Sequence, residues 1–218
     1  CANGKDDNCN GQTDEPPCAA GTYVCTGCAG ASDTNGGTQN SPVKTIAKGI
    51  ANAVALSQNT VFVAGFVGAS PQVYFEDLTI PNGVVVQGRW VVTTGGPTNI
   101  WARNGATRTL VNNATAAGLK FAPGATRSAG LDGLTIQASA AGGTFQVVGV
   151  SIASASPLLK DFSVQGAPIG GFPPIEAIGV LVTGTPAAPA FPRLEGSNTT
   201  RSTVTVSDGT DAATEAPP

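Results

Sequence analysis

One four-residue pattern recurs in this chain, as Gly118-Leu119-Lys120-Phe121, Gly149-Val150-Ser151-Ile152 and Gly179-Val180-Leu181-Val182. The copies begin 31 and 30 residues apart. A second pattern reads Glu76-Asp77-Leu78-Thr79-Ile80, Asp132-Gly133-Leu134-Thr135-Ile136 and Lys160-Asp161-Phe162-Ser163-Val164. Its Leu or Phe positions are 56 and 28 residues apart. Two interleaved patterns with a common period near 28–31 residues indicate a coil that returns to the same place on every turn.

This period predicts a fold class. A coil of three short strands and three corners needs roughly 20 to 30 residues, and alternate residues of each strand would face a narrow core. Each strand would pair in parallel with the coils above and below it, so no crossover helices are required. We therefore predict an all-β fold, a right-handed parallel β-helix over residues 31–206. An antiparallel β-sandwich is the alternative, because turn residues also recur about every 8–12 positions.

One helix is expected at about residues 42–56, with Ser41 as its N-cap and Pro42 at its first position. Val43, Ile46, Ile50 and Val54 would form its apolar stripe, and the helix would cap the first coil. The stretch 89–104 is expected to be a loop that leaves the coil. The candidate strands are Thr60–Ala64, Val73–Ile80, Val84–Gly88, Thr109–Val111, Leu119–Phe121, Leu134–Gln137, Phe145–Ile152, Leu158–Val164, Ile178–Val182 and Val204–Val206.

Composition limits the classes of function. Only 11% of the residues are charged, and the formal net charge is −3. The 11 Lys and Arg residues are spread thinly, which disfavours nucleic-acid binding because phosphate neutralisation needs clustered cations. Apolar runs are too short to form a transmembrane segment. The chain contains no His, which excludes Ser-His and Cys-His nucleophile pairs.

All the cysteines lie in the first 28 residues, at Cys1, Cys9, Cys18, Cys25 and Cys28. Such clustering indicates local disulfides and an oxidising compartment, so we expect an extracellular or outer cell-surface protein. We favour a Cys1–Cys9 pair and one pair among the other three. In one alternative Cys1 is the acylated first residue of a lipoprotein and the other four cysteines pair. In another, the Cys25–Cys28 CxxC binds zinc, although no second CxxC or His would complete the site.

The Cys-rich head, residues 1–30, also contains a loop typical of calcium sites. Residues 6–11 match the first half of an EF-hand loop, in which oxygens at alternate positions converge on a hard cation and Gly11 permits the turn. The candidate ligands are Asp6, Asn8, Asn10, Gln12, Asp14 and Glu15, with Glu15 replacing the acid that is missing at Pro17. An all-oxygen ligand set favours calcium over copper. A metal-free turn held by disulfides is the alternative.

Two stretches resemble known families. Asn40-Ser41-Pro42-Val43-Lys44-Thr45-Ile46, followed by Val61-Phe62-Val63-Ala64-Gly65 and Gly83-Val84-Val85-Val86-Gln87-Gly88, resembles the opening segment of pectin-lyase-like right-handed parallel β-helix proteins. That resemblance covers about residues 31–206 and implies a fold, not an activity, because lyases, hydrolases, adhesins and inert surface repeats share the scaffold. Residues 1–15 resemble the short Cys/Asp/Asn metal-binding motif of bacterial secreted proteins that is named from a copper-binding outer-surface protein. Asn8 and Asn10 stand where that motif usually has Asp.

These observations predict a non-enzymatic secreted or cell-surface structural or binding protein, with residues 207–218 as a linker or truncated end. A polysaccharide or other surface component is the expected partner, and Trp90, Trp101 and Tyr74 are candidates for sugar stacking. One alternative is a carbohydrate-active enzyme, a polysaccharide lyase or hydrolase, or a remnant of one. Another is a fibre subunit that forms homo-oligomers through the solenoid ends. The repeat register would give Asp77 and Asp161 one rung position, and Glu76 and Asp132 another.

Overall fold

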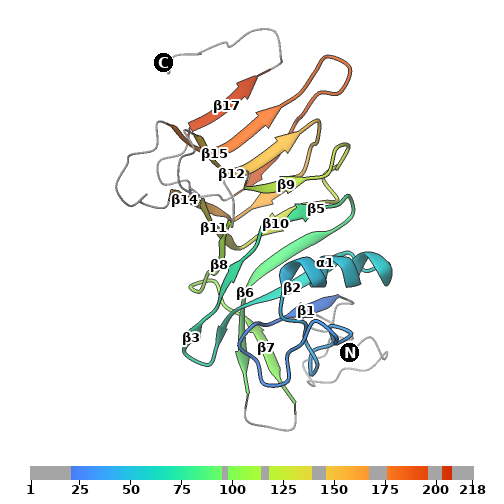
Figure 1. Cartoon of the computed structure of the whole chain (residues 1–218), viewed down its shortest axis with the longest axis vertical. Helices are drawn as coiled ribbons and strands as arrows, with labels where there is room; N and C mark the ends of the chain where they lie inside the picture. The colour runs from blue at the N-terminus through green and yellow to red at the C-terminus, as the bar shows by residue number, and fades with distance from the viewer. Residues whose placement is uncertain are drawn as a thin grey trace. The chain divides into compact units, whose positions relative to one another are not determined.

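The computed structural model describes residues 21–94, 98–113, 118–138, 146–166, 176–195 and 203–207. The chain divides into two compact units. Unit 1 comprises Cys1–Gln72 and Val86–Thr109, and unit 2 comprises Val73–Val85 and Leu110–Pro218. The described part is mostly β-structure with one short helix, and most of the strands pair in parallel (Figure 1).

Unit 1 is built on a sheet in the order β1-β2-β6, formed by β1 (Thr22–Val24), β2 (Thr60–Val67) and β6 (Val85–Thr93). β1 pairs with β2 in parallel. The short β3 (Ser70–Pro71) and β7 (Ile100–Arg103) turn back antiparallel on β2 and β6.

The expected loop at 89–104 is therefore wrong, because this stretch forms a hairpin in which Trp90 pairs with Arg103 and Thr93 with Ile100. Aromatic and β-branched residues flank the turn residues of this stretch, which is the composition of a β-hairpin.

Helix α1 (Ile46–Ala55) begins four residues after the expected first position at Pro42. Its N-cap is Thr45, whose hydroxyl accepts a hydrogen bond from the Lys48 N–H at 3.2 Å. Val43 is extended instead of helical, because its N–H donates to the Tyr23 carbonyl and its carbonyl accepts from the Cys25 N–H. Pairing with β1 thus outweighs the local preference for an earlier helix start.

The buried face of α1 consists of Ile46, Gly49, Ile50 and Ala53. Gly49 lies close against the sheet, since a Cβ added there would come within 2.4 Å of the Val24 side chain. Val54 falls one position beyond this stripe and is 55% exposed, so its expected burial is wrong.

β6 contains a left-handed residue, Arg89, with a φ of 68°. The hydroxyl of Thr109 bonds to the backbone at this left-handed residue. It accepts a hydrogen bond from the Arg89 N–H at 2.9 Å and donates one to the Val63 carbonyl of β2 at 3.3 Å. Gly65 leaves the space for this contact, since a Cβ there would lie 2.8 Å from the Thr109 hydroxyl. One buried hydroxyl therefore satisfies two backbone groups in unit 1.

Replacing Thr109 by Val should lower the free energy of unfolding by about 1–3 kcal/mol, because it leaves a buried N–H and a buried carbonyl without this partner. Thr109→Ser keeps the hydroxyl and should fall closer to the wild type. Urea unfolding followed by tryptophan fluorescence measures both, with Thr38→Val as the control at an exposed hydroxyl that accepts from the Ser41 N–H. Equal stability of Thr109→Val and Thr38→Val would contradict this role.

In its described residues, unit 2 contains three sets of paired strands (Figure 1). The first runs in the order β10 (Gly130–Asp132), β13 (Leu158–Lys160), β16 (Arg193–Glu195). The second runs β4 (Val73–Phe75), β8 (Thr109–Asn112), β11 (Leu134–Ala138), β14 (Ser163–Gly166). The third runs β5 (Thr79–Ile80), β9 (Leu119–Phe121), β12 (Gln146–Ala153), β15 (Glu176–Thr183), β17 (Thr203–Ser207).

The first sequence repeat is confirmed as a parallel ladder. Leu119 pairs with Val150, and Val150 pairs with Val180 on the next strand. The neighbouring inward positions Phe121, Ile152 and Val182 are buried in the same way. Residues one period apart therefore occupy neighbouring layers, an arrangement compatible with a β-helix.

The second repeat is confirmed for two of its three copies. Thr135 pairs with Ser163 in parallel, so the copies around Leu134 and Phe162 are equivalent. The assignment of Glu76–Ile80 to the second repeat is wrong, because Thr79 pairs with Lys120 and so belongs to the first repeat.

The predicted strand Val73–Ile80 is in fact two strands, β4 and β5, in different sheets. For the same reason, the prediction that Asp77 and Asp161 share one rung position is wrong. The prediction that Glu76 and Asp132 share another is wrong as well. The predicted strand Leu158–Val164 is likewise divided, at the left-handed Asp161 with a φ of 47°.

Candidate functional site

The predicted metal ligands Asp6, Asn8, Asn10, Gln12, Asp14 and Glu15 lie outside the described residues, as do Cys1, Cys9 and Cys18. Cys25 and Cys28 form a disulfide, which confirms one pair among the last three cysteines. Oxidised sulfur atoms are not thiolates, so this CxxC is not a zinc site in this state. No group of three or more His, Cys, Asp or Glu that could hold a metal occurs in the described ranges.

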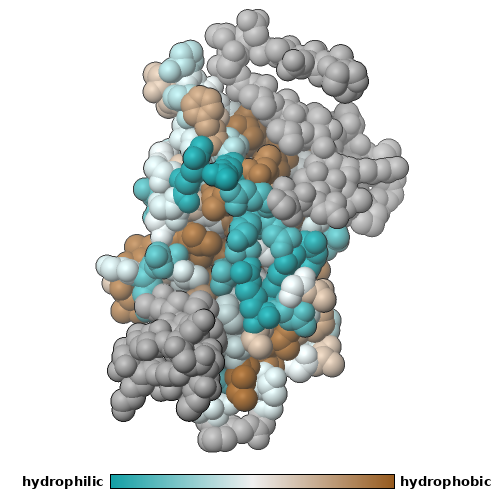
Figure 2. All heavy atoms as spheres, turned by 180° about the vertical axis from the view of Figure 1, so that it is seen from behind, coloured by the Kyte–Doolittle hydropathy of each residue, from teal (hydrophilic) through white to brown (hydrophobic). Residues whose placement is uncertain are grey.

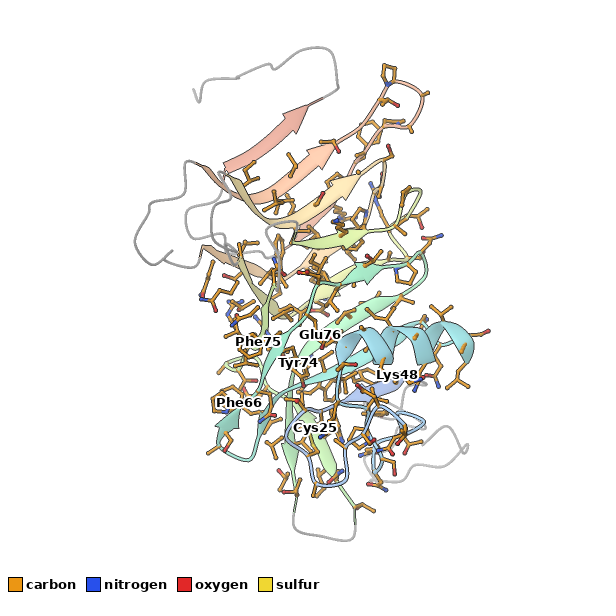
Figure 3. All side chains as sticks on the ribbon, in the orientation of Figure 1. Cys25, Lys48, Phe66, Tyr74, Phe75 and Glu76 are labelled. Atoms are coloured by element: carbon orange, nitrogen blue, oxygen red, sulfur yellow. A yellow bond between two sulfur atoms is a disulfide. The ribbon has the colours of Figure 1, made fainter. Side chains whose placement is uncertain are left out.

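Trp90, Trp101 and Tyr74, the predicted sugar-stacking residues, are each only 2% exposed. In unit 1 the two Trp rings pack with Tyr23 and Phe62. The centroid distances are 5.0 Å for Tyr23–Trp101, 5.2 Å for Phe62–Trp90 and 4.9 Å for Tyr23–Phe62. The Cys25–Cys28 disulfide belongs to the same buried cluster, and Cys25 is labelled in Figure 3. These rings stabilise the interior of unit 1 and present no open face to a sugar.

Burial raises the pKa of the Tyr23 phenol from 10.0 to about 12 by desolvation. The folded-state pKa thus lies above the unfolded one. The stability that this neutral phenol contributes is complete below pH 10 and is lost as the pH rises towards 12.

We expect the free energy of unfolding to decline more steeply between about pH 10 and 12 in the wild type than in Tyr23→Phe, by up to about 3 kcal/mol over the window. Urea unfolding at stepped pH gives the two slopes. Because the chain has two tyrosines, the difference in tyrosinate absorbance between the native wild type and Tyr23→Phe gives the pKa of Tyr23. Parallel slopes for the two proteins would contradict the assignment.

A charged column runs across the first sheet of unit 2. Asp132, Lys160 and Glu195 are register partners on β10, β13 and β16, so their side chains lie on one face at about 4.8 Å per strand. Arg193 forms an ion pair with Glu195, with 2.6 Å between Nε and Oε1. The alternation of acid, base and acid stabilises the pairing register.

The other predicted carboxylates do not join the column as register partners. Asp77 lies at the corner between β4 and β5, and Glu176 lies at the start of β15. Asp161 follows β13, and its N–H donates to the Glu195 carbonyl at 2.7 Å.

The outer face of the second sheet of unit 2 carries a different set of side chains, which we call the amide face. The inward residues Tyr74, Val111, Ile136 and Val164 are buried, so the alternate positions point outward. Phe75 pairs with Asn112, and Gln137 pairs with Gln165. The Asn113 N–H donates to the Gln137 carbonyl at 3.0 Å, which sets Asn112 beside Gln137. The result is one outward column of Phe75, Asn112, Gln137 and Gln165.

Phe75 is the exposed aromatic residue of this face. Its side chain is 72% exposed, whereas that of the preceding Tyr74 is 2% exposed, and Figure 3 labels both on β4. Tyr74 and not Phe75 was the predicted stacking residue, and two adjacent aromatic residues do not reveal which one faces inward. The register of Tyr74 with Val111 would have settled the choice, since Val111 continues the buried column.

Two polar atoms of the amide face are buried without a hydrogen-bond partner in the described part of the chain, Asn112 Oδ1 and Thr135 Oγ1. Thr135 is 4% exposed and belongs to the second outward column, with Val73, Leu110 and Ser163. Neither column contains an ionisable side chain. Because Thr135 and Ser163 are buried, the face offers carboxamide groups beside one exposed ring.

Exposed apolar side chains elsewhere in unit 2 include Phe191 and Leu194, 65% and 46% exposed. The rear view in Figure 2 shows hydrophobic patches interrupted by hydrophilic residues.

Among the described residues, no helix is long and apolar enough to cross a membrane.

No family model, curated protein or solved structure matches this chain. The resemblance to pectin-lyase-like proteins and to the copper-binding surface motif therefore stays a prediction.

Proposed function

We propose that this chain is a non-enzymatic secreted or cell-surface protein in which a right-handed parallel β-helix acts as a rigid structural and binding scaffold. The observation that carries the proposal is the in-register pairing of Leu119, Val150 and Val180, which are one sequence period apart. Equivalent residues stacked in columns make a stiff rod in which every coil supports the next. Such a rod suits a spacer or a display surface.

The disulfide supports an oxidising location. Cys25 is fully buried and Cys28 is 6% exposed, so the bond links two residues within the buried cluster of unit 1. Disulfides of this structural kind are typical of secreted and surface proteins. The weakly charged composition agrees with a scaffold that has no strong electrostatic ligand.

Fractionation of the cells that make the protein tests this location. We expect protease added to intact cells to remove the chain, or the chain to be present in the medium, with Cys25 and Cys28 unreactive to thiol reagents until reduction. The same material should leave the chain length of soluble polysaccharides unchanged. Recovery from the cytosol with reactive thiols, or shortening of a polysaccharide, would contradict the proposal.

The head adds a calcium-type loop to this scaffold, with Asp6, Asp14 and Glu15 as its acidic ligands. Isothermal titration should show one calcium ion bound with a dissociation constant of about 10⁻⁴–10⁻³ M, the range of extracellular modules. Asp6→Asn and Asp14→Asn should each weaken binding about tenfold or more, because each removes a charged oxygen ligand. Asp77→Asn is the control with the same charge change outside the head. Calcium binding that survives both head variants, or selective binding of copper, would contradict the calcium assignment.

A further inference from the structure

We propose that the amide face of unit 2 binds a neutral polysaccharide, with Phe75 stacking on a sugar ring and Asn112, Gln137 and Gln165 bonding to hydroxyl groups. The inference rests on the proposed scaffold function, since it names the ligand class for which the scaffold would provide a surface. It rests on an aromatic residue and a row of carboxamides that the fold brings together from β4, β8, β11 and β14.

The polar groups of this face match sugar hydroxyls. A carboxamide donates through its nitrogen and accepts through its oxygen, and a sugar hydroxyl can answer either group. Gln165 is exposed and the side chains of Asn112 and Gln137 are partly exposed, so a ligand from solvent can reach these carboxamides. The reachable groups of this face therefore suit a hydroxyl-rich molecule.

Phe75 supplies the apolar half of the contact. Its ring is 72% exposed at one end of the column, and aromatic rings contribute large apolar area at low conformational cost. The C–H face of a sugar is the apolar surface that such a ring can cover. The carboxamides follow it at successive strands, about 4.8 Å apart, so the recognising groups repeat along a line. A linear array suits a polymer better than a single sugar.

The absence of charge in both outward columns of the face selects a neutral polymer. The residues concerned are Val73, Phe75, Leu110, Asn112, Thr135, Gln137, Ser163 and Gln165. An acidic polysaccharide would need cations to replace the hydration of its carboxylates, and these columns provide none. Binding should therefore be insensitive to salt, unlike binding between charged partners.

Affinity electrophoresis of the full chain tests the inference, in native gels that contain hydroxyethylcellulose, galactomannan or xylan, with polygalacturonate as the acidic comparison. We expect retardation in at least one of the neutral gels and none with polygalacturonate. The retardation should persist in about 0.5 M salt. Phe75→Ala and Gln137→Leu should each weaken the affinity about fivefold, as the loss of one ring contact or one hydrogen bond implies.

Phe191→Ala is the matched control, because it removes a phenylalanine that is 65% exposed in the same unit but outside the amide face. It should bind as the wild type does. The inference is overturned if no neutral polysaccharide retards the wild type, if Phe75→Ala binds unchanged, or if Phe191→Ala loses as much affinity as Phe75→Ala. These outcomes are separate from cell fractionation, which tests the scaffold function without any ligand.

Discussion

Parallel pairing in register is the constraint on which the structure of unit 2 depends. When Val150 pairs with Leu119 on one side and Val180 on the other, each side chain must sit on its equivalent in the next layer. Apolar residues tolerate this stacking, and each fully buried Leu, Val or Ile contributes about 1.5–3 kcal/mol. Charged residues tolerate it only if the sign alternates, as it does from Asp132 to Lys160 to Glu195. Neutral amides stack freely, which makes the column from Asn112 to Gln165 possible.

The corners impose a second constraint. Gly133 and Asp161 both have left-handed backbone, with φ of 75° and 47°, at the points where the first sheet gives way to the second. The Gly133 N–H donates to the Lys160 carbonyl, and the Asp161 N–H donates to the Glu195 carbonyl. Each corner is thus tied to the layer that follows it. The conformation costs about 1–2 kcal/mol at Asp161, and these layer contacts hold it in place.

The sequence predicted the parallel pairing of strands wherever its period acted through several layers. The ladder from Leu119 to Val180 was visible because three copies agree in spacing and in residue type. The prediction from the sequence failed where one copy of a repeat stood alone. This happened at Glu76–Ile80, whose residues fit both repeats. Local propensity also misplaced the start of α1, because the pairing of Val43 with β1 is a tertiary contact that no helix signal contains. The hairpin of β6 and β7 was missed because its pairing is antiparallel and belongs to neither sequence repeat.

The outward residues of the amide face were harder to predict than the parallel pairing. The reason is that a short strand does not reveal which of its side chains face outward. In Val73-Tyr74-Phe75 all three side chains are apolar, so alternation alone does not reveal which of them face water. Only the partner strand decides, because Val111 is buried and Tyr74 is its register partner. The parallel register aligns four outward residues in one column, namely Phe75, Asn112, Gln137 and Gln165. The composition of such a face is therefore a property of the register and not of any single strand, and a fold assignment alone does not reveal a ligand.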